Sequence, residues 1–270
     1  MKVGFDLYDA QSSGARAAVI AEPVISAGGV IVPPAGYFDA LRDETRKRGM
    51  LLIFDEAQTA FGRLGHWFAA SHLGVTPDIM TVSKTLGGGI PLAAAITTDA
   101  IEDSCHRRGF SFYTSHVSDP LPATVGLAVL ETIAQDRLLE RSREMGDYLA
   151  AGLAALAARH EEIGDLRGMG LLRGIELVKD RETREPNHEL GALTTARCLE
   201  LGLSMNIRRR PERGSVWRIA PPLTVEREDI DLAMAIFDQA LTEMKDEIAR
   251  KRRSGTIGPE TTSAARSRAS

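Results

Sequence analysis

The fold is decided by residues 51–58, which read LLIFDEAQ, together with residues 83–89, which read SKTLGGG. Asp55 directly follows an apolar run that is typical of a buried strand, and Lys84, 29 positions later, closely follows another such run. In an open parallel sheet, the carboxyl ends of the strands lie along one edge, and ligands bind there. We therefore expect the acid and the lysine to lie at the same edge of a mostly parallel sheet.

An acid and a lysine at such an edge suit the cofactor pyridoxal phosphate (PLP). The lysine amine can bond covalently to the cofactor, and the carboxylate can hold the pyridine nitrogen protonated, so that the ring accepts electrons. Gln58 could hydrogen-bond the phenolic oxygen of the ring, and Ala57 is small enough to lie against the ring face. Considered alone, Lys84 could instead extend its amine to the surface, and Asp55 could cap a helix. The glycines follow Lys84 instead of preceding it, so the segment is not a P-loop.

The first half of the chain alternates strand-like and helical segments. Short apolar runs at residues 17–21, 51–54, 79–82 and 92–96 predict strands, and residues 37–48 predict a helix that ends at Gly49. This alternation predicts an α/β layer with a mostly parallel sheet. Residues 1–16 are polar and contain glycine and serine, which is a poor start for a folded domain.

After about residue 120 the pattern changes to long amphipathic helices. Strand-like runs lie between two such helices, near residues 171–178 and 216–219. The apolar residues that share one face of the first helix are Leu138, Met145, Leu149, Leu153 and Leu156. We therefore predict a large domain over residues 1–134 and a smaller α+β domain over residues 135–245. Residues 246–270 are basic and then rich in Ser, Thr, Ala and Arg, which predicts a disordered tail.

The composition bounds the class of protein. The chain has 270 residues, a net charge of -4 and 43% hydrophobic residues, which is typical of a globular protein and argues against a nucleic-acid surface. No apolar run approaches the roughly 20 residues that cross a membrane, and the first ten residues do not resemble a signal peptide. Cys105 and Cys198 lie far apart and lack zinc-site spacing. We expect reduced thiols in a cytoplasmic protein without a membrane partner.

Two further segments carry residues that could bind a ligand. Arg218 lies within an apolar run, and a guanidinium is the natural bidentate partner of a carboxylate, although a structural salt bridge would also explain it. Ser115 and Asp119 lie before a predicted helix, where they could bind a phosphate or a cation or could cap the helix. His116, taken alone, is more often structural than a general acid or base.

Together these segments resemble the class III (ornithine/GABA type) PLP-dependent aminotransferases. The motifs are AEP at residues 21–23, DEAQT at 55–59, SKTLG at 83–87, YTSHVSDP at 113–120, LGLSMNI at 201–207 and RIAPPLT at 218–224. The resemblance covers roughly residues 5–245 and implies the type I fold of PLP-dependent transferases. The stretch at 113–120 resembles the dialkylglycine decarboxylase branch of the family, because other members have a glycine-rich segment there.

The resemblance also implies a role for each matching residue. Lys84 would be the Schiff-base lysine and the proton carrier, Asp55 would pair with the pyridine nitrogen, and Gln58 would contact the phenolic oxygen. Ser115 would bind the phosphate of a neighbouring subunit's cofactor, in a homodimer with shared active sites. Arg218 would hold the carboxylate of the amino acid or 2-oxo acid substrate, with Glu22 nearby. Ser115, Val117 and Asp119 match part of a site for an alkali metal, K⁺ or Na⁺.

Departures from the family pattern leave several functions open. Ala27 replaces a serine of the decarboxylase branch, and Ala60 and Leu64 also differ from the usual pattern. The chain begins inside the family's large domain, so part of the phosphate site and one ring face are expected to be missing, and apolar surface to be exposed. We expect decarboxylating transamination of dialkylglycines with amino transfer to a 2-oxo acid. The alternatives are ordinary transamination by Cα–H cleavage and a fragment that is inactive or depends on a partner.

Overall fold

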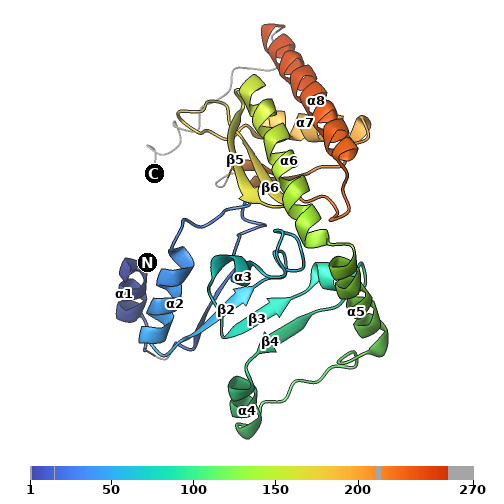
Figure 1. Cartoon of the computed structure of the whole chain (residues 1–270). Helices are drawn as coiled ribbons and strands as arrows, with labels where there is room; N and C mark the ends of the chain where they lie inside the picture. The colour runs from blue at the N-terminus through green and yellow to red at the C-terminus, as the bar shows by residue number, and fades with distance from the viewer. Residues whose placement is uncertain (1, 15, 211–213, 255–270) are drawn as a thin grey trace.

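The computed structural model describes residues 2–14, 16–210 and 214–254, and it contains two sheets in separate halves (Figure 1). The first sheet has the order β1 (Ala18–Ala21), β2 (Leu51–Asp55), β3 (Ile79–Val82) and β4 (Ala94–Thr97). β1, β2 and β3 are parallel, and β4 pairs antiparallel with β3. The predicted α/β class with a mostly parallel sheet is therefore confirmed.

Helical segments precede, connect and follow the strands of the first sheet. These are α1 (Lys2–Gln11), α2 (Tyr37–Lys47), α3 (Ala69–Leu73), the short 3-10 helix η1 (Lys84–Gly87), α4 (Asp99–Arg107) and α5 (Pro120–Gln135). α2 buries Phe38 and Leu41, which lie three residues apart on one helix face, against Leu52 and Phe54 of β2. Gly49 follows α2 with φ +63°, a conformation that glycine adopts at low cost.

The expectation of a poor start to the chain is wrong for residues 2–11. These residues form α1, and its Phe5 is buried in the same core as Phe38 and Leu52. The guanidinium of Arg48 lies 4.7 Å from the centre of the Phe5 ring and forms ion pairs with Asp6 and Asp9. The helix is therefore held by tertiary contacts, which the polar local sequence does not reveal.

The second half is an antiparallel sheet covered on one face by helices. Its strand order is β5 (Ile163–Met169), β6 (Leu172–Leu177), β8 (Gly214–Ile219) and β7 (Asn206–Arg210). The helices are α6 (Leu138–Arg159), α7 (His188–Glu200) and α8 (Arg227–Arg253). Ile175, Leu177 and Trp217 join the helical core, where the Trp217 ring meets Phe237 edge-on at 4.7 Å. Because side chains alternate along a strand, the neighbouring residues Gly174 and Arg218 face the other side of the sheet.

Two expectations about this half need correction. Only β6 and β8 were predicted, whereas β5 and β7 also form. The predicted disordered tail is wrong for residues 246–253, because α8 continues to Arg253 and buries Ile248. Residues 255–270 lie outside the described part of the chain. The two sheets fall on either side of residue 134, and the division into domains there stays a prediction. Among the described helices, none combines the length and the apolar character needed to cross a membrane.

Candidate active site at the carboxyl edge of the first sheet

Three predicted site residues emerge at one edge of the first sheet. β1, β2 and β3 run in parallel, so their carboxyl ends lie side by side. Glu22 follows β1, Asp55 is the last residue of β2, and Lys84 comes two residues after the end of β3. Because β4 runs in the opposite direction, its first residues lie at this edge as well.

A hollow of about 400 Å³ lies beside Asp55 at this edge. Its lining consists of Asp55, Ala57, Thr81, Val82, Ser83 and Ala93 to Ala95. Oδ1 of Asp55 accepts hydrogen bonds from the backbone N–H of Ala57 at 3.0 Å and from Oγ1 of Thr81 at 3.3 Å. Among the described residues, no donor contacts Oδ2. The carboxylate is thus held in place through Oδ1, while Oδ2 can still accept a hydrogen bond from a donor in the hollow.

Small side chains make this hollow suitable for a flat ring. Ala57, Ala93, Ala94 and Ala95, whose side chains are single methyl groups, are among its lining residues. A PLP ring needs a broad, shallow space with a carboxylate at the nitrogen end, and the hollow beside Asp55 provides both. The residues present therefore fit this part of the cofactor.

Lys84 adopts a backbone conformation that is unusual for its type. It has φ +51°, in the left-handed region, and it begins η1 directly after Ser83, which lines the hollow. A non-glycine residue in this region costs on the order of 1 kcal/mol or more, and such residues often occur at functional sites. The side chain of Lys84 is exposed and is not part of the hollow's lining.

The loop after β2 is anchored by an acid to which no role was predicted. Glu56 is fully buried and accepts hydrogen bonds from Oγ1 of Thr59 at 2.7 Å, from the N–H of Ala69 at 2.9 Å and from the N–H of Ala70 at 2.8 Å. The three-residue spacing of Glu56 and Thr59 is the one feature of the local sequence that could indicate the contact between these two side chains. Gln58 lies between these two anchored residues, half-buried and outside the hollow's lining.

Arg218 is reached by loops that leave the same sheet edge. Its Nη1 donates to Oγ of Ser26 at 3.2 Å, and the N–H of Ser26 donates to Oε2 of Glu22 at 3.0 Å. Arg63, in the loop after β2, donates to the carbonyl oxygens of Leu171 and Pro221. Burial, together with the nearby positive charge of Arg218, lowers the pKa of Arg63 to about 10. Two guanidinium groups thus lie close together, an arrangement that favours binding of an anion.

The structure does not bring the predicted phosphate and metal residues into this hollow. Ser115 and Val117 are exposed in the loop between α4 and α5, and Asp119 is half-exposed at its end (Figure 1). The carboxylate of Asp119 lies 2.9 Å from Nδ1 of His116. Within the described part of the chain, no group of three or more His, Cys, Asp or Glu residues could hold a metal ion.

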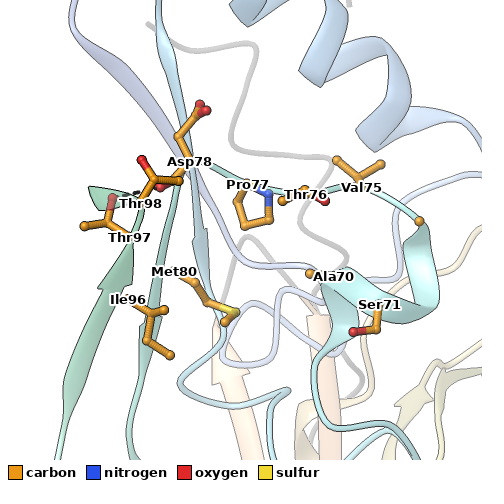
Figure 2. A pocket seen from close by; sticks show the side chains of 11 residues that line it. Ala70, Ser71, Val75, Thr76, Pro77, Asp78, Met80, Ile96, Thr97 and Thr98 are labelled. Carbon is orange, nitrogen blue, oxygen red and sulfur yellow. Dashed lines mark hydrogen bonds between the residues drawn. The ribbon is translucent and has the colours of Figure 1, made fainter. Parts of the chain in front are cut away.

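A second hollow, of about 430 Å³, lies at the opposite edge of the sheet. Figure 2 shows Thr97 and Thr98 beside Asp78, with Met80 and Ile96 below them. The Asp78 carboxylate is bound to both Nη atoms of Arg42, at 2.5 and 2.8 Å, and to the N–H of Leu52. This carboxylate is already paired and the hollow contains none of the predicted site residues, so the candidate site is the carboxyl edge.

Comparison with known proteins gives one consistent family. The family profile "Aminotransferase class-III" matches residues 5–241. An uncharacterized aminotransferase of Schizosaccharomyces pombe is 48% identical over 88% of this chain and 53% of its own length. A leucine/methionine racemase of Thermococcus litoralis is 39% identical over 85% of this chain and 51% of its own. A taurine–pyruvate aminotransferase of Bilophila wadsworthia is 38% identical over 83% and 52%.

Solved structures agree with this result. An aminotransferase from Bacillus anthracis superposes with a TM-score of 0.85 at 32% identity, over 90% of this chain and 56% of that one. An omega transaminase from Pseudomonas jessenii, in complex with PMP, gives a TM-score of 0.82 at 30% identity, over 92% and 55%. The predicted type I fold of PLP-dependent transferases is therefore confirmed. The chain spans about half the length of the curated relatives that it matches.

Proposed function

This chain belongs to the class III aminotransferase family, and from that premise we propose that it carries the lysine, acid and arginine of a PLP-dependent amino transfer. The substrates are an amino acid and a 2-oxo acid. The proposal rests above all on Asp55, whose Oδ1 is fixed by two hydrogen bonds while Oδ2 has no donor among the described residues. The proposal is also supported by Lys84, which follows β3 at the same edge of the sheet, and by Arg218 of β8, which the loop after β1 contacts through Ser26.

Each residue has a distinct task in this proposal. When bound, PLP supplies an electron-accepting ring that weakens a bond at the substrate Cα. Asp55 keeps a proton on the pyridine nitrogen, and Gln58 donates to the phenolic oxygen. Lys84 holds the cofactor through Nζ and then moves a proton at Cα. Arg218 binds the substrate carboxylate, and the nearby charge of Arg63 strengthens the attraction.

We propose decarboxylation of dialkylglycines as the finer reaction. The support is the sequence YTSHVSDP at residues 113–120, which resembles that branch of the family. In this reaction the carboxylate leaves Cα as CO₂, whereas ordinary transamination breaks the Cα–H bond and uses Lys84 as proton carrier. Ser115, Val117 and Asp119 would then contribute to a K⁺ or Na⁺ site.

We also propose a homodimer with shared active sites in the cytoplasm. Large apolar side chains are exposed on and after the edge strand β4, at Ile96, Phe110, Phe112, Tyr113 and Leu121. Such a surface favours burial against another chain. Ser115 lies in the same loop, where it could serve the cofactor phosphate of the opposite subunit. Both cysteines are free thiols, which is typical of a reducing compartment.

The first test is cofactor binding to the purified chain. PLP is added to the wild type, to Lys84→Ala and to the control Lys47→Ala, whose lysine is exposed in α2. We expect a visible absorbance band that depends on Lys84 but not on Lys47. Reduction with borohydride should leave the cofactor on the Lys84 peptide in a mass spectrum. If the wild-type chain is folded but shows no band, the result would support the alternative of a fragment that is inactive or depends on a partner.

A second assay separates the two reactions. The loaded enzyme is given 2-aminoisobutyrate with pyruvate, and CO₂ and alanine are measured. Release of both supports decarboxylating transamination. Amino transfer from substrates with a Cα–H bond, without CO₂ from 2-aminoisobutyrate, would support ordinary transamination instead.

A further inference from the structure

Three residues form a row across the second sheet, on the face turned away from its helices. Arg167 of β5 pairs with Gly174 of β6, and Gly174 pairs with Arg218 of β8. Directly paired residues point to the same side of a sheet. The glycine therefore leaves a slot between the side chains of two arginines.

The loop at residues 25–31, which follows β1, occupies this slot. The carbonyl oxygen of Gly29 accepts from Nε of Arg167 at 2.8 Å, and Oγ of Ser26 accepts from Nη1 of Arg218 at 3.2 Å. Val30 lies over the glycine, because a Cβ added to Gly174 would be 2.9 Å from Cβ of Val30. A loop of the first half thus contacts all three members of the row.

The loop has little freedom to move within the slot. Ile25 and Ile31 exchange two backbone hydrogen bonds, at 2.9 and 3.0 Å, and the carbonyl oxygen of Ser26 accepts from Gly29 and Val30. Val30 has φ +55°, a costly conformation for a β-branched residue, and it is fully buried. Packing against the surrounding residues keeps this strained conformation in place.

Ser26 is the point where this rigid loop contacts the arginine. Its side chain is 2% exposed, and its backbone N–H also binds Glu22. We infer that Ser26 is a positioning residue that fixes the guanidinium of Arg218 for a substrate carboxylate and links it to Glu22. The inference rests on the proposed role of Arg218, and it adds a residue and a loop to that role.

The test compares Ser26→Ala with Ser26→Thr, which keeps the hydroxyl. The control is Ser71→Ala in α3, a residue that lines the hollow at the opposite edge of the first sheet. Isobutyrate, which has a carboxylate but no amine, is titrated into the PLP-treated full chain by calorimetry. Loss of one positioning hydrogen bond predicts about 3- to 10-fold weaker binding for Ser26→Ala. Ser26→Thr and Ser71→Ala should stay within about twofold of the wild type. Melting temperature and PLP content are measured in parallel and should change little.

A second measurement does not depend on the ligand. The Nε–Hε signal of Arg218 in ¹⁵N-arginine-labelled protein, assigned with Arg218→Lys, reports the order of this side chain. We expect its heteronuclear NOE to fall in Ser26→Ala and to be unchanged in Ser71→Ala.

The outcomes separate the inference from the proposed function. If Arg218→Lys weakens isobutyrate binding and Ser26→Ala does not, or if the NOE is unchanged in Ser26→Ala, the positioning role is refuted and the proposed function stands. If the wild type fails to bind isobutyrate while the NOE falls in Ser26→Ala, the carboxylate site fails and the structural link between Ser26 and Arg218 is supported.

Discussion

Glu56→Gln tests whether a buried carboxylate holds the loop that contains Gln58. Glu56 is fully buried, and its two oxygens accept three hydrogen bonds, from Thr59, Ala69 and Ala70. Glutamine has nearly the same shape but replaces one of these oxygens with an NH₂ donor. The substitution therefore changes hydrogen bonding and charge while it leaves the packing almost unchanged.

The magnitude follows from the three contacts. With its carbonyl oxygen in the place of Oε2, the glutamine can still accept from Thr59 and Ala69, but its NH₂ group then faces the N–H of Ala70 at the position of Oε1. One unpaired N–H costs about 1–3 kcal/mol, and the two remaining bonds lose their charge-assisted strength. Relief of the desolvation of a buried charge offsets part of this loss. We expect the free energy of unfolding to fall by about 2–4 kcal/mol.

Urea unfolding of the full chain, followed by tryptophan fluorescence, measures this change. Trp67 lies at the end of the anchored loop, where its carbonyl oxygen accepts from the N–H of Phe61 at 2.6 Å. The matched control is Glu131→Gln on the exposed surface of α5, which should change the free energy by less than about 0.5 kcal/mol. Equal small effects for both variants would refute the anchoring role and would mean that backbone contacts alone hold the loop.

Three other predictions concern separate parts of the molecule. Burial, and then the positive charges of His72 and Arg143, lower the pKa of His66 below 6.5. As the pH drops below about 6.5, His66 therefore binds a proton more readily in the unfolded chain than in the folded chain, and the free energy of unfolding falls. Urea titrations should show a weaker pH dependence for His66→Gln. Burial raises the pKa of the Cys198 thiol to about 11, so this thiol should react with iodoacetamide only in the unfolded chain. Mass spectrometry measures the modification, and modification of the native chain at pH 8 would contradict the structure. Gly170 has φ +51°, and the substitution Gly170→Ala would place a Cβ 2.8 Å from the backbone of Leu64. The free energy of unfolding should fall by about 1–3 kcal/mol, and an unchanged urea midpoint would contradict this prediction.

The sequence predicted the parts of the fold that depend on local pattern. Apolar runs that end at Asp55 and shortly before Lys84 predict two strands, and their parallel pairing at one edge is the simplest arrangement of strands that alternate with helices. The second half was harder to predict because β5 contains two glycines and β7 contains three arginines, so neither has the apolar alternation of a typical strand. The high charge of the last turns of α8 predicts a tail, although Glu, Lys and Arg are good helix formers.

The contact between Ser26 and Arg218 could not be predicted from the sequence, because it joins distant segments. Ser26 and Arg218 are 192 positions apart and meet only because β8 pairs with β6 in the register that places Arg218 opposite Gly174. A shift of one residue in that register would turn Arg218 toward the helical core and Trp217 toward the loop. The buried Trp217 and its edge-on contact with Phe237 strongly disfavour such a shift. Core packing on one face of the sheet therefore sets the direction of the arginine on the other, and the site depends on the hydrophobic contact between Trp217 and Phe237.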